Sequence, residues 1–190
     1  MCRFPVMPPC ANRVLYAMFD LKDVGFRTEG KTAKTLLSDI SVSFPTRAFS
    51  AIVGHNGSGK STLLKILARK YRQFDGQIHM GKVALGEHSI RDFARKVAYL
   101  PQSPTVPPHL SVRELVGFGR YPWRGAFGRY RATDFEKIDH AMALTHVENF
   151  ADRLVSSLSG GERQRVWLAM LLAQDAPTLL LDEPTSALDV

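Results

Sequence analysis

Gly54-His55-Asn56-Gly57-Ser58-Gly59-Lys60-Ser61 is the stretch that decides the fold of this 190-residue chain. The short apolar run Ser50 to Val53, predicted to be a strand, leads into it, and apolar residues with helical spacing follow at 63–67. A glycine-rich turn between a strand and a helix that ends in Lys-Ser matches the pattern of a phosphate-binding loop. A chain of this length matches the pattern by accident in about 1% of cases. We therefore predict a nucleotide-binding site here.

The chemistry of phosphate binding explains the residue types in this loop. Glycines allow backbone N–H groups to converge on phosphate oxygens, and the following helix directs its positive N-terminal end at the same anion. Lys60 can reach the β- and γ-phosphates, and the Ser61 hydroxyl can bind Mg²⁺. The residues predicted to contact the nucleotide are Gly54, Asn56, Gly57, Ser58, Gly59, Lys60, Ser61 and Thr62.

Two adjacent carboxylates follow the apolar run Thr178 to Leu181. The run has the composition of a parallel strand covered on both faces, and ligands bind at the carboxyl ends of such strands. We assign Asp182 to the Mg²⁺ shell and Glu183 to polarising the attacking water as a general base. By itself, an apolar run ending in Asp-Glu is more often the start of a solvated loop. Together with the phosphate loop, it indicates nucleotide hydrolysis.

A second glycine-containing stretch, Leu158-Ser159-Gly160-Gly161-Glu162, opens a predicted helix over 161–173. Ser159 and Glu162 have the spacing of a capping box, which by itself accounts only for a helix start. The adjacent glycines favour a further role, because their unobstructed N–H groups and the helix dipole can form a second anion site.

The rest of the chain has the organisation of an α/β protein. Weak alternation over 19–44 predicts antiparallel strands with a turn at 28–34, and 97–100 is predicted to be a buried strand. Residues 105–155 form a predicted helical insert, interrupted by the glycine-containing stretch 117–128. Residues 1–17 lack the features of a signal peptide, and we expect the native protein to start at Met18, with 1–17 a disordered or non-native extension.

Composition is that of a soluble globular protein. Hydrophobic residues make up 45% and charged residues 23%, which excludes a disordered or fibrous chain, and no apolar run is long enough to span a membrane. Cys2 and Cys10 are too few for a disulfide framework or a zinc site, and they favour a reducing compartment. The net charge of +7 suits nucleotide, nucleic acid or anionic lipid, or simply a solvated basic surface.

Five motifs, in their order along the chain, resemble those of the ATP-binding subunits of ATP-binding cassette (ABC) transporters, and the resemblance covers about 21–190. The Leu-Ser-Gly-Gly-Glu stretch is highly specific to that family, whereas the phosphate loop is shared with many NTPases. The resemblance implies a P-loop NTPase of the ABC type, with a mostly parallel core sheet, an N-terminal antiparallel β subdomain and a helical insert. The matching segments are Gly54–Ser61, Tyr99–Gln102, Leu158–Gln164, Leu179–Glu183 and Ser186–Asp189.

The same resemblance implies how the site works. Two subunits would form a head-to-tail homodimer around two ATP molecules with Mg²⁺, each ATP held by one phosphate loop and by Ser159, Gly160 and Gly161 of the other subunit. Gln102 would contact the Mg²⁺ or the water, and Asp189 the partner subunit. The implied catalytic residues are then Glu183, Lys60 and Gln102, and the implied metal ligands are Ser61, Gln102 and Asp182.

Within the family, Gly119-Arg120-Tyr121-Pro122-Trp123 and 157–175 resemble the importers of ferric siderophores, most of all the ferric hydroxamate (ferrichrome-type) ATPases. The implied function is hydrolysis of ATP to power an importer at the cytoplasmic face of the inner membrane. The implied partners are an integral-membrane permease and, indirectly, a periplasmic binding protein, without nucleic acid. A cobalamin or haem importer is the alternative cargo.

Three other classes are less favoured. DNA-repair and chromosome-structure ATPases insert long coiled coils between the two glycine motifs, and no heptads occur between Lys60 and Ser159. Translation-associated proteins normally carry two cassettes, and one is present. A non-hydrolytic binding module is disfavoured because Asp182 and Glu183 are both intact.

Two departures from the family pattern stand out. The aromatic residue that stacks on adenine corresponds to Thr28, so stacking would be weak or come from Phe26 or Arg27, although Phe26 by itself is better read as a core residue. The family also has a later strand ending in a histidine that contacts the γ-phosphate, and this chain stops at Val190 before such a strand. We therefore expect a cassette over 18–190 that is truncated at its C-terminus, with an open sheet edge. Such a chain is expected to be poorly soluble in isolation and weakly active or inactive.

Arginines gather in the predicted helical insert. They suit contact with a membrane subunit or anionic headgroups, while a merely solvated face is the simpler interpretation. These arginines are Arg113, Arg120, Arg124, Arg129 and Arg131.

Overall fold

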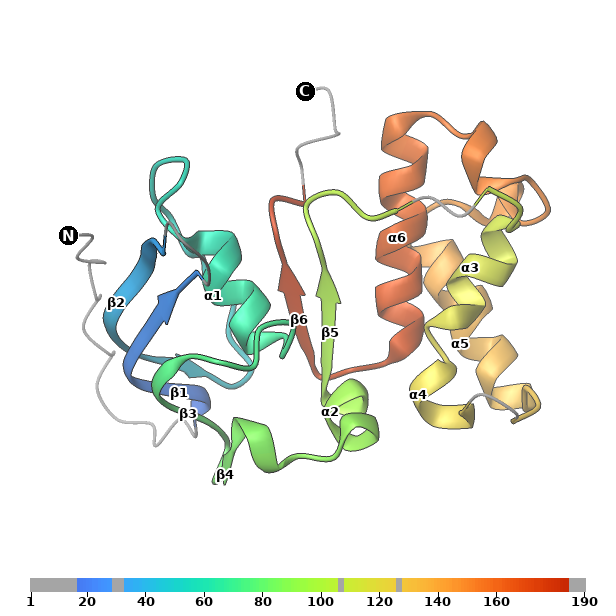
Figure 1. The fold of residues 1–190 in the computed structure, drawn as a ribbon. Helices are drawn as coiled ribbons and strands as arrows, with labels where there is room; N and C mark the ends of the chain where they lie inside the picture. Colours follow the sequence, from blue (N-terminus) through green and yellow to red (C-terminus); the bar gives the residue numbers. More distant parts are fainter. Residues whose placement is uncertain (1–16, 29–32, 106–107, 126–127, 185–190) are drawn as a thin grey trace. The chain divides into compact units, whose positions relative to one another are not determined.

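The computed structural model describes residues 17–28, 33–105, 108–125 and 128–184, and the chain divides into two compact units, Met1–His88 and Ser89–Val190 (Figure 1). The proposed N-terminal extension lies outside the described residues except for Ala17, which begins the first strand. Because each unit has its own core, the two are described one at a time.

The first unit is built on an antiparallel sheet with the strand order β2-β1-β3-β4. The antiparallel strands predicted over 19–44 are confirmed, and the Thr28 N–H donates to the Lys34 carbonyl at 3.0 Å where the turn was expected. Its elements are β1 (Ala17–Arg27), β2 (Thr35–Pro45), α1 (Lys60–Leu67), β3 (Asp75–Met80), β4 (Val83–Ala84) and the short 3₁₀ helix η1 (Leu85–Glu87).

Burial of apolar side chains on one face of this sheet explains why the strands form. Successive side chains of a strand alternate between faces, so Phe19 and Leu21 of β1 lie on the same side, and both are buried. The register of β1 against β2 shifts between Leu21 and Val24, where Asp23 takes a left-handed backbone conformation, and Val24 is fully buried after the shift. Helix α1 buries Leu63, Ile66 and Leu67.

The prediction of a strand over 50–53 is wrong, because the structure has no strand there and Val53 is 67% exposed. A strand exists only through hydrogen bonds to a neighbouring strand, and no described segment of the first unit pairs with 50–53. The apolar composition of the run is a local property, whereas its pairing depends on the rest of the chain.

The second unit contains a parallel strand pair and a group of helices (Figure 1). The strands predicted at 97–100 and 178–181 are confirmed, with Val97 opposite Thr178 and Leu100 opposite Leu181. The elements are α2 (Ile90–Lys96), β5 (Val97–Leu100), α3 (Val112–Phe118), α4 (Tyr121–Arg124), α5 (Ala132–Leu144), the 3₁₀ helices η2 (Glu148–Phe150) and η3 (Val155–Ser157), α6 (Gly160–Gln174) and β6 (Thr178–Leu181).

Helix α6 is the centre of this unit, since it packs against α3, α5 and β5. The predicted helical insert is confirmed, with α4 forming inside the expected interruption. Helices α3 and α6 approach closely at Gly119, where a Cβ atom would collide with the Met170 carbonyl. β6 is less completely covered than its composition predicts, because Leu179 is 40% exposed. None of the described helices could span a bilayer, as each is too short or too polar.

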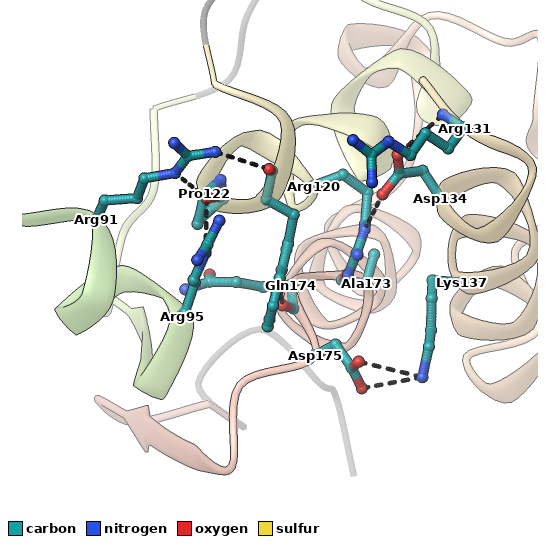
Figure 2. Close-up of polar contacts among 11 residues, drawn as sticks. Arg91, Arg95, Arg120, Pro122, Arg131, Asp134, Lys137, Ala173, Gln174 and Asp175 are labelled. Atoms are coloured by element: carbon teal, nitrogen blue, oxygen red, sulfur yellow. Dashed lines mark hydrogen bonds and ion pairs between the residues drawn. The ribbon is translucent and has the colours of Figure 1, made fainter. Parts of the chain in front are cut away.

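One arginine of the insert is buried and does not belong to the exposed basic surface that the sequence suggests. Arg120 is 6% exposed, and Figure 2 shows it between α5 and the end of α6. Its Nε donates to Asp134 Oδ1 at 2.8 Å and a terminal nitrogen donates to the Ala173 carbonyl at 2.8 Å. A guanidinium has enough donors to satisfy a carboxylate and a helix C-terminal carbonyl together, which makes this burial possible. Arg120 is therefore not part of an exposed basic surface.

Two other members of the set also have contacts within the unit. The Arg124 guanidinium lies over the Tyr130 ring, 4.4 Å from its centroid, and Arg113 forms an exposed ion pair with Asp139 at 2.6 Å. Arg129 and Arg131 are exposed.

Candidate functional site

The phosphate loop of the first unit needs glycine for two separate reasons. Gly57 and Gly59 have φ angles of +79° and +92°, which L side chains rarely adopt. In addition, a Cβ atom on Gly59 would lie 2.6 Å from Leu37 Cδ2 and 2.9 Å from the Leu36 carbonyl oxygen. Gly59 is the N-cap of α1, so Lys60 and Ser61 are the first two residues of that helix.

Two side chains of the loop offer donors to an anion. Lys60 folds back over the loop, where Nζ donates to the carbonyls of Gly54 at 2.9 Å and His55 at 3.0 Å. Ser58 is 7% exposed, and its Oγ is a buried hydroxyl for which the described residues supply no hydrogen-bond partner. A buried hydroxyl of this kind fits a polar ligand, because leaving it unbonded costs free energy. The loop therefore fits the nucleotide phosphates that its sequence predicts.

The residues considered for adenine stacking have other contacts. Phe26 is half-buried rather than fully in the core, and its ring stacks on Tyr71 with centroids 4.9 Å apart and planes inclined by 16°. Thr28 closes the following turn, because its Oγ1 accepts the Lys34 N–H at 2.9 Å. The expectation that Phe26 is simply a core residue is corrected to a partly exposed aromatic pair.

In the second unit, the parallel pairing of β5 and β6 brings together residues that are far apart in sequence. Gln102, just beyond β5, donates from Nε2 to Glu183 Oε2 at 2.5 Å across a separation of 81 residues. The Asp182 N–H continues the ladder by donating to the Leu100 carbonyl at 3.0 Å. Asp182 is 3% exposed, and the Tyr99 hydroxyl lies 3.5 Å from Oδ2. The structure thus groups three of the predicted site residues at one end of the strand pair.

A further residue, next in sequence to none of these three, also contacts the backbone at this end of the strand pair and had no role in the sequence-based prediction. Gln164, 8% exposed, donates from Nε2 to the Pro184 carbonyl at 2.6 Å. Gln164 is the last residue of the matching segment Leu158–Gln164. The sequence did not indicate which group its side chain would bind, because the acceptor is a backbone atom 20 residues away.

The predicted capping box at the start of α6 is confirmed. The Glu162 N–H donates to Ser159 Oγ at 3.3 Å, and the Ser159 N–H donates to a Glu162 carboxylate oxygen at 2.7 Å. The hydrogen bonds from the Ser159 hydroxyl and N–H lower the pKa of Glu162 and keep it ionised. Ser111 and Glu114 form the same box at the start of α3, so the capping geometry alone does not distinguish α6 as an anion site.

The predicted site residues are distributed over both units: the phosphate loop lies in the first, and Gln102, Ser159–Gly161, Asp182 and Glu183 lie in the second. The segment Ser186–Asp189, with the predicted partner contact Asp189, lies outside the described residues.

The residues predicted for Mg²⁺ have the right chemistry. A Ser61 hydroxyl, a Gln102 amide oxygen and an Asp182 carboxylate are oxygen ligands, which this cation prefers. The described residues contain no cluster of three or more His, Cys, Asp or Glu that could hold a metal ion.

A match to a family model decides between the NTPase classes that share a phosphate loop. Residues 37–186 match the model described as ABC transporter. The chain belongs to the ABC transporter family. This confirms the resemblance on which the fold class was predicted.

Relatives with curated names and a solved structure agree with this assignment. The iron(3+)-hydroxamate import ATP-binding protein of Bacillus subtilis (strain 168) is 41% identical over 157 residues, 83% of this chain and 58% of that protein. The ferric enterobactin transport ATP-binding protein of Escherichia coli (strain K12) is 40% identical over 163 residues, 86% of this chain and 60% of that protein. A dimeric ATP-binding cassette in a post-hydrolysis state with ADP and Pi aligns with a TM-score of 0.78 and 27% identity, over 90% of this chain and 76% of that one.

The ABC fold expected from the sequence, with its antiparallel β subdomain and helical insert, is thus confirmed. The chain spans about three fifths of the length of the two curated relatives, 58% and 60%.

Proposed function

We propose that the protein is the ATP-hydrolysing subunit of an ABC importer and that it powers the uptake of iron(III)-hydroxamate siderophores. The observation that carries the proposal is the hydrogen bond from Gln102 to Glu183, beside the buried Asp182, at the ends of two parallel strands. A carboxylate held by an amide donor at this position can orient and polarise a water molecule for attack on a phosphate.

The remaining roles follow from the chemistry of each group. The phosphate loop, including Thr62, would bind the ATP phosphates, with Lys60 Nζ exchanging its loop carbonyls for phosphate oxygens. Ser61, Gln102 and Asp182 would hold Mg²⁺, which when bound neutralises charge on the transferred phosphoryl group. Glu183 would act as the general base, and its exposed position gives it access to water.

The proposed assembly is a head-to-tail homodimer in which Ser159, Gly160 and Gly161 contact the ATP bound by the partner subunit. In its favour, the similar solved cassette is a dimer with ADP and Pi. The other proposed partners are a membrane permease and, through it, a periplasmic binding protein. The proposed location is the cytoplasmic face of the inner membrane.

The names of the relatives favour siderophore cargo over the alternatives. The name of one relative refers to iron(3+)-hydroxamate import, and the name of the other refers to ferric enterobactin transport. The hydroxamate assignment therefore rests on similarity alone, because an ATP-binding subunit does not touch the cargo. Cobalamin or haem import remains the alternative to test, and the family match leaves DNA-repair and translation-associated ATPases less favoured.

Glu183→Gln tests the proposed chemistry. The change keeps the shape of the side chain and removes the base, so phosphate release should fall by about 10²- to 10⁴-fold. The affinity for ATP should be retained, because the phosphate loop is intact. Both quantities are measured on the full-length protein with its membrane subunits.

Glu136→Gln provides the matched control, since Glu136 is an exposed glutamate on α5 outside the proposed site. It should hydrolyse ATP at the rate of the unmodified protein. Turnover by Glu183→Gln at that same rate would show that Glu183 is not the general base.

A further inference from the structure

Glu183 has an unusual backbone conformation. Its φ angle is +49°, in the left-handed region that residues with a Cβ atom seldom adopt. Such a conformation persists only where the surrounding structure holds it, and in proteins it is concentrated at functional positions. The question is which contacts hold the turn at this residue.

The chain is held on both sides of Glu183. On the preceding side, the Asp182 N–H donates to the Leu100 carbonyl of β5 at 3.0 Å. On the following side, the Pro184 carbonyl accepts the Gln164 amide of α6 at 2.6 Å. Proline has no N–H, so its carbonyl is the only backbone group through which Pro184 can be held by a hydrogen bond.

Gln164 is well suited to this task. Its side chain is buried, with 8% of the residue exposed, so the hydrogen bond is shielded from competing water. It lies in the second turn of α6, the helix whose first residues carry the proposed ATP contact at Ser159, Gly160 and Gly161. The glutamine therefore joins that helix to the backbone directly after the proposed base.

We propose that Gln164 is a positioning residue for hydrolysis, whose amide fixes the Glu183–Pro184 turn from helix α6. The proposal rests on the function proposed above for Glu183. With the Gln102 amide on the Glu183 carboxylate and the Gln164 amide on the next carbonyl, both the side chain and the backbone of the base are oriented. A displacement of α6 at its first turn is thereby transmitted to the base.

The same helix offers a matched control. Gln174, at the last position of α6, donates from Nε2 to the carbonyls of Ala94 at 2.6 Å and Val97 at 3.1 Å, and Figure 2 shows it near α2. Like Gln164, it is a glutamine whose side-chain amide ties α6 to backbone carbonyls. The hydrogen bonds of its amide go to Ala94 and Val97 and not to the Glu183–Pro184 turn, so removing that amide tests the structural contribution alone.

The experiment compares Gln164→Met with Gln174→Met in the full-length protein with its membrane subunits. Methionine keeps the length of the side chain and removes the donor. Misplacing a catalytic group by about 1 Å can cost about 10²-fold in rate, so for Gln164→Met we expect kcat to fall about tenfold or more, with KM for ATP changed less than about twofold. Gln174→Met should keep the kcat of the unmodified protein, although both variants lower the melting temperature.

A double variant tests whether the effect passes through Glu183. If Gln164 acts by positioning the base, adding Gln164→Met to Glu183→Gln should not lower the residual turnover further. A full additional loss in the double variant would assign Gln164 to another role and overturn the proposal.

Gln164→Asn is a second variant that controls for a folding defect in Gln164→Met. It keeps a polar amide, but the side chain is shorter by one methylene group. We expect it to fold and to lower kcat in the same direction. The proposal is overturned if the Asn and Met variants both turn over ATP at the unmodified rate, or if Gln174→Met loses as much kcat as Gln164→Met. Failure of the proposed function would be recognised separately, because Glu183→Gln itself would then remain active.

Discussion

Gly59 occupies a position where the backbone and the surroundings both exclude a side chain. Its φ angle is +92°, and a Cβ atom would lie 2.6 Å from Leu37 and 2.9 Å from the Leu36 carbonyl oxygen. Gly57, two residues earlier, has a φ angle of +79° but open space around the Cβ position. The two glycines separate the cost of backbone conformation from the cost of a steric collision.

Gly59→Ala should therefore be the more damaging of two matched changes. Placing alanine in a left-handed conformation costs about 1–2 kcal/mol, and Gly57→Ala should lose about this much free energy of unfolding. Gly59→Ala should lose more and should also weaken ATP binding, because relieving the clash shifts the N-terminus of α1. Urea unfolding and equilibrium ATP binding measure the two effects. Equal losses in both variants would contradict the steric argument.

At the scale of elements, a buried ion pair joins the helices of the second unit. Arg120 follows α3, Asp134 lies in the first turn of α5, and their side chains are 8% and 5% exposed. Burial raises the pKa of Asp134, but hydrogen bonds from the Arg131 N–H and the Arg120 guanidinium outweigh it, so the pKa is lowered overall. Arg91 and Arg95 extend the polar contacts by donating to the Pro122 carbonyl, which ties α2 to α4.

Asp134→Asn should destabilise the protein strongly at neutral pH, because it leaves the Arg120 cation buried without its partner. Breaking a buried pair in this way costs about 3–5 kcal/mol. Since the pKa of Asp134 is lower in the folded protein, its contribution is complete above the unfolded value of about 3.9 and is lost as the pH falls through the folded value. The difference between the unmodified protein and the variant should thus shrink in acid. Urea unfolding at a series of pH values measures it.

The exposed pair Arg113–Asp139 provides the comparison, with side chains 45% and 56% exposed. Asp139→Asn should change the free energy of unfolding by no more than about 1 kcal/mol, because exposed pairs are screened by solvent. If Asp134→Asn were as mild as Asp139→Asn at neutral pH, the buried pair would not be a significant contributor to stability.

At the scale of the whole molecule, features encoded in a few consecutive residues were predictable from sequence, and features that depend on distant partners were not. The phosphate loop, the capping box at Ser159 and the strand before Asp182 are local patterns, and the structure contains each of them. The run 50–53 has a strand-like composition without a strand partner in its unit. From the sequence alone, Arg120 is expected to be exposed. In the structure it is buried and paired with a carboxylate 14 residues away.

Gln164 shows the same limit at the candidate site. The carboxylates after a buried strand predicted Glu183, the family resemblance predicted Gln102, and the structure places the two in contact. Nothing in the residues around Gln164 indicates that its amide reaches the carbonyl of Pro184, because that contact depends on how α6 packs relative to β6. Sequence patterns predicted the candidate reacting groups, while the contacts that hold them are visible only in the folded chain.

Whether ATP hydrolysis by this protein drives siderophore import can be measured in one experiment. Cells that lack the natural protein are complemented with the full-length unmodified protein, Glu183→Gln or Glu136→Gln, and the uptake of an iron(III)-hydroxamate complex is followed. The unmodified protein and Glu136→Gln should restore uptake, and Glu183→Gln should not, because the permease would receive no energy from hydrolysis. Uptake at the full rate with Glu183→Gln, or none with the unmodified protein, would contradict the account.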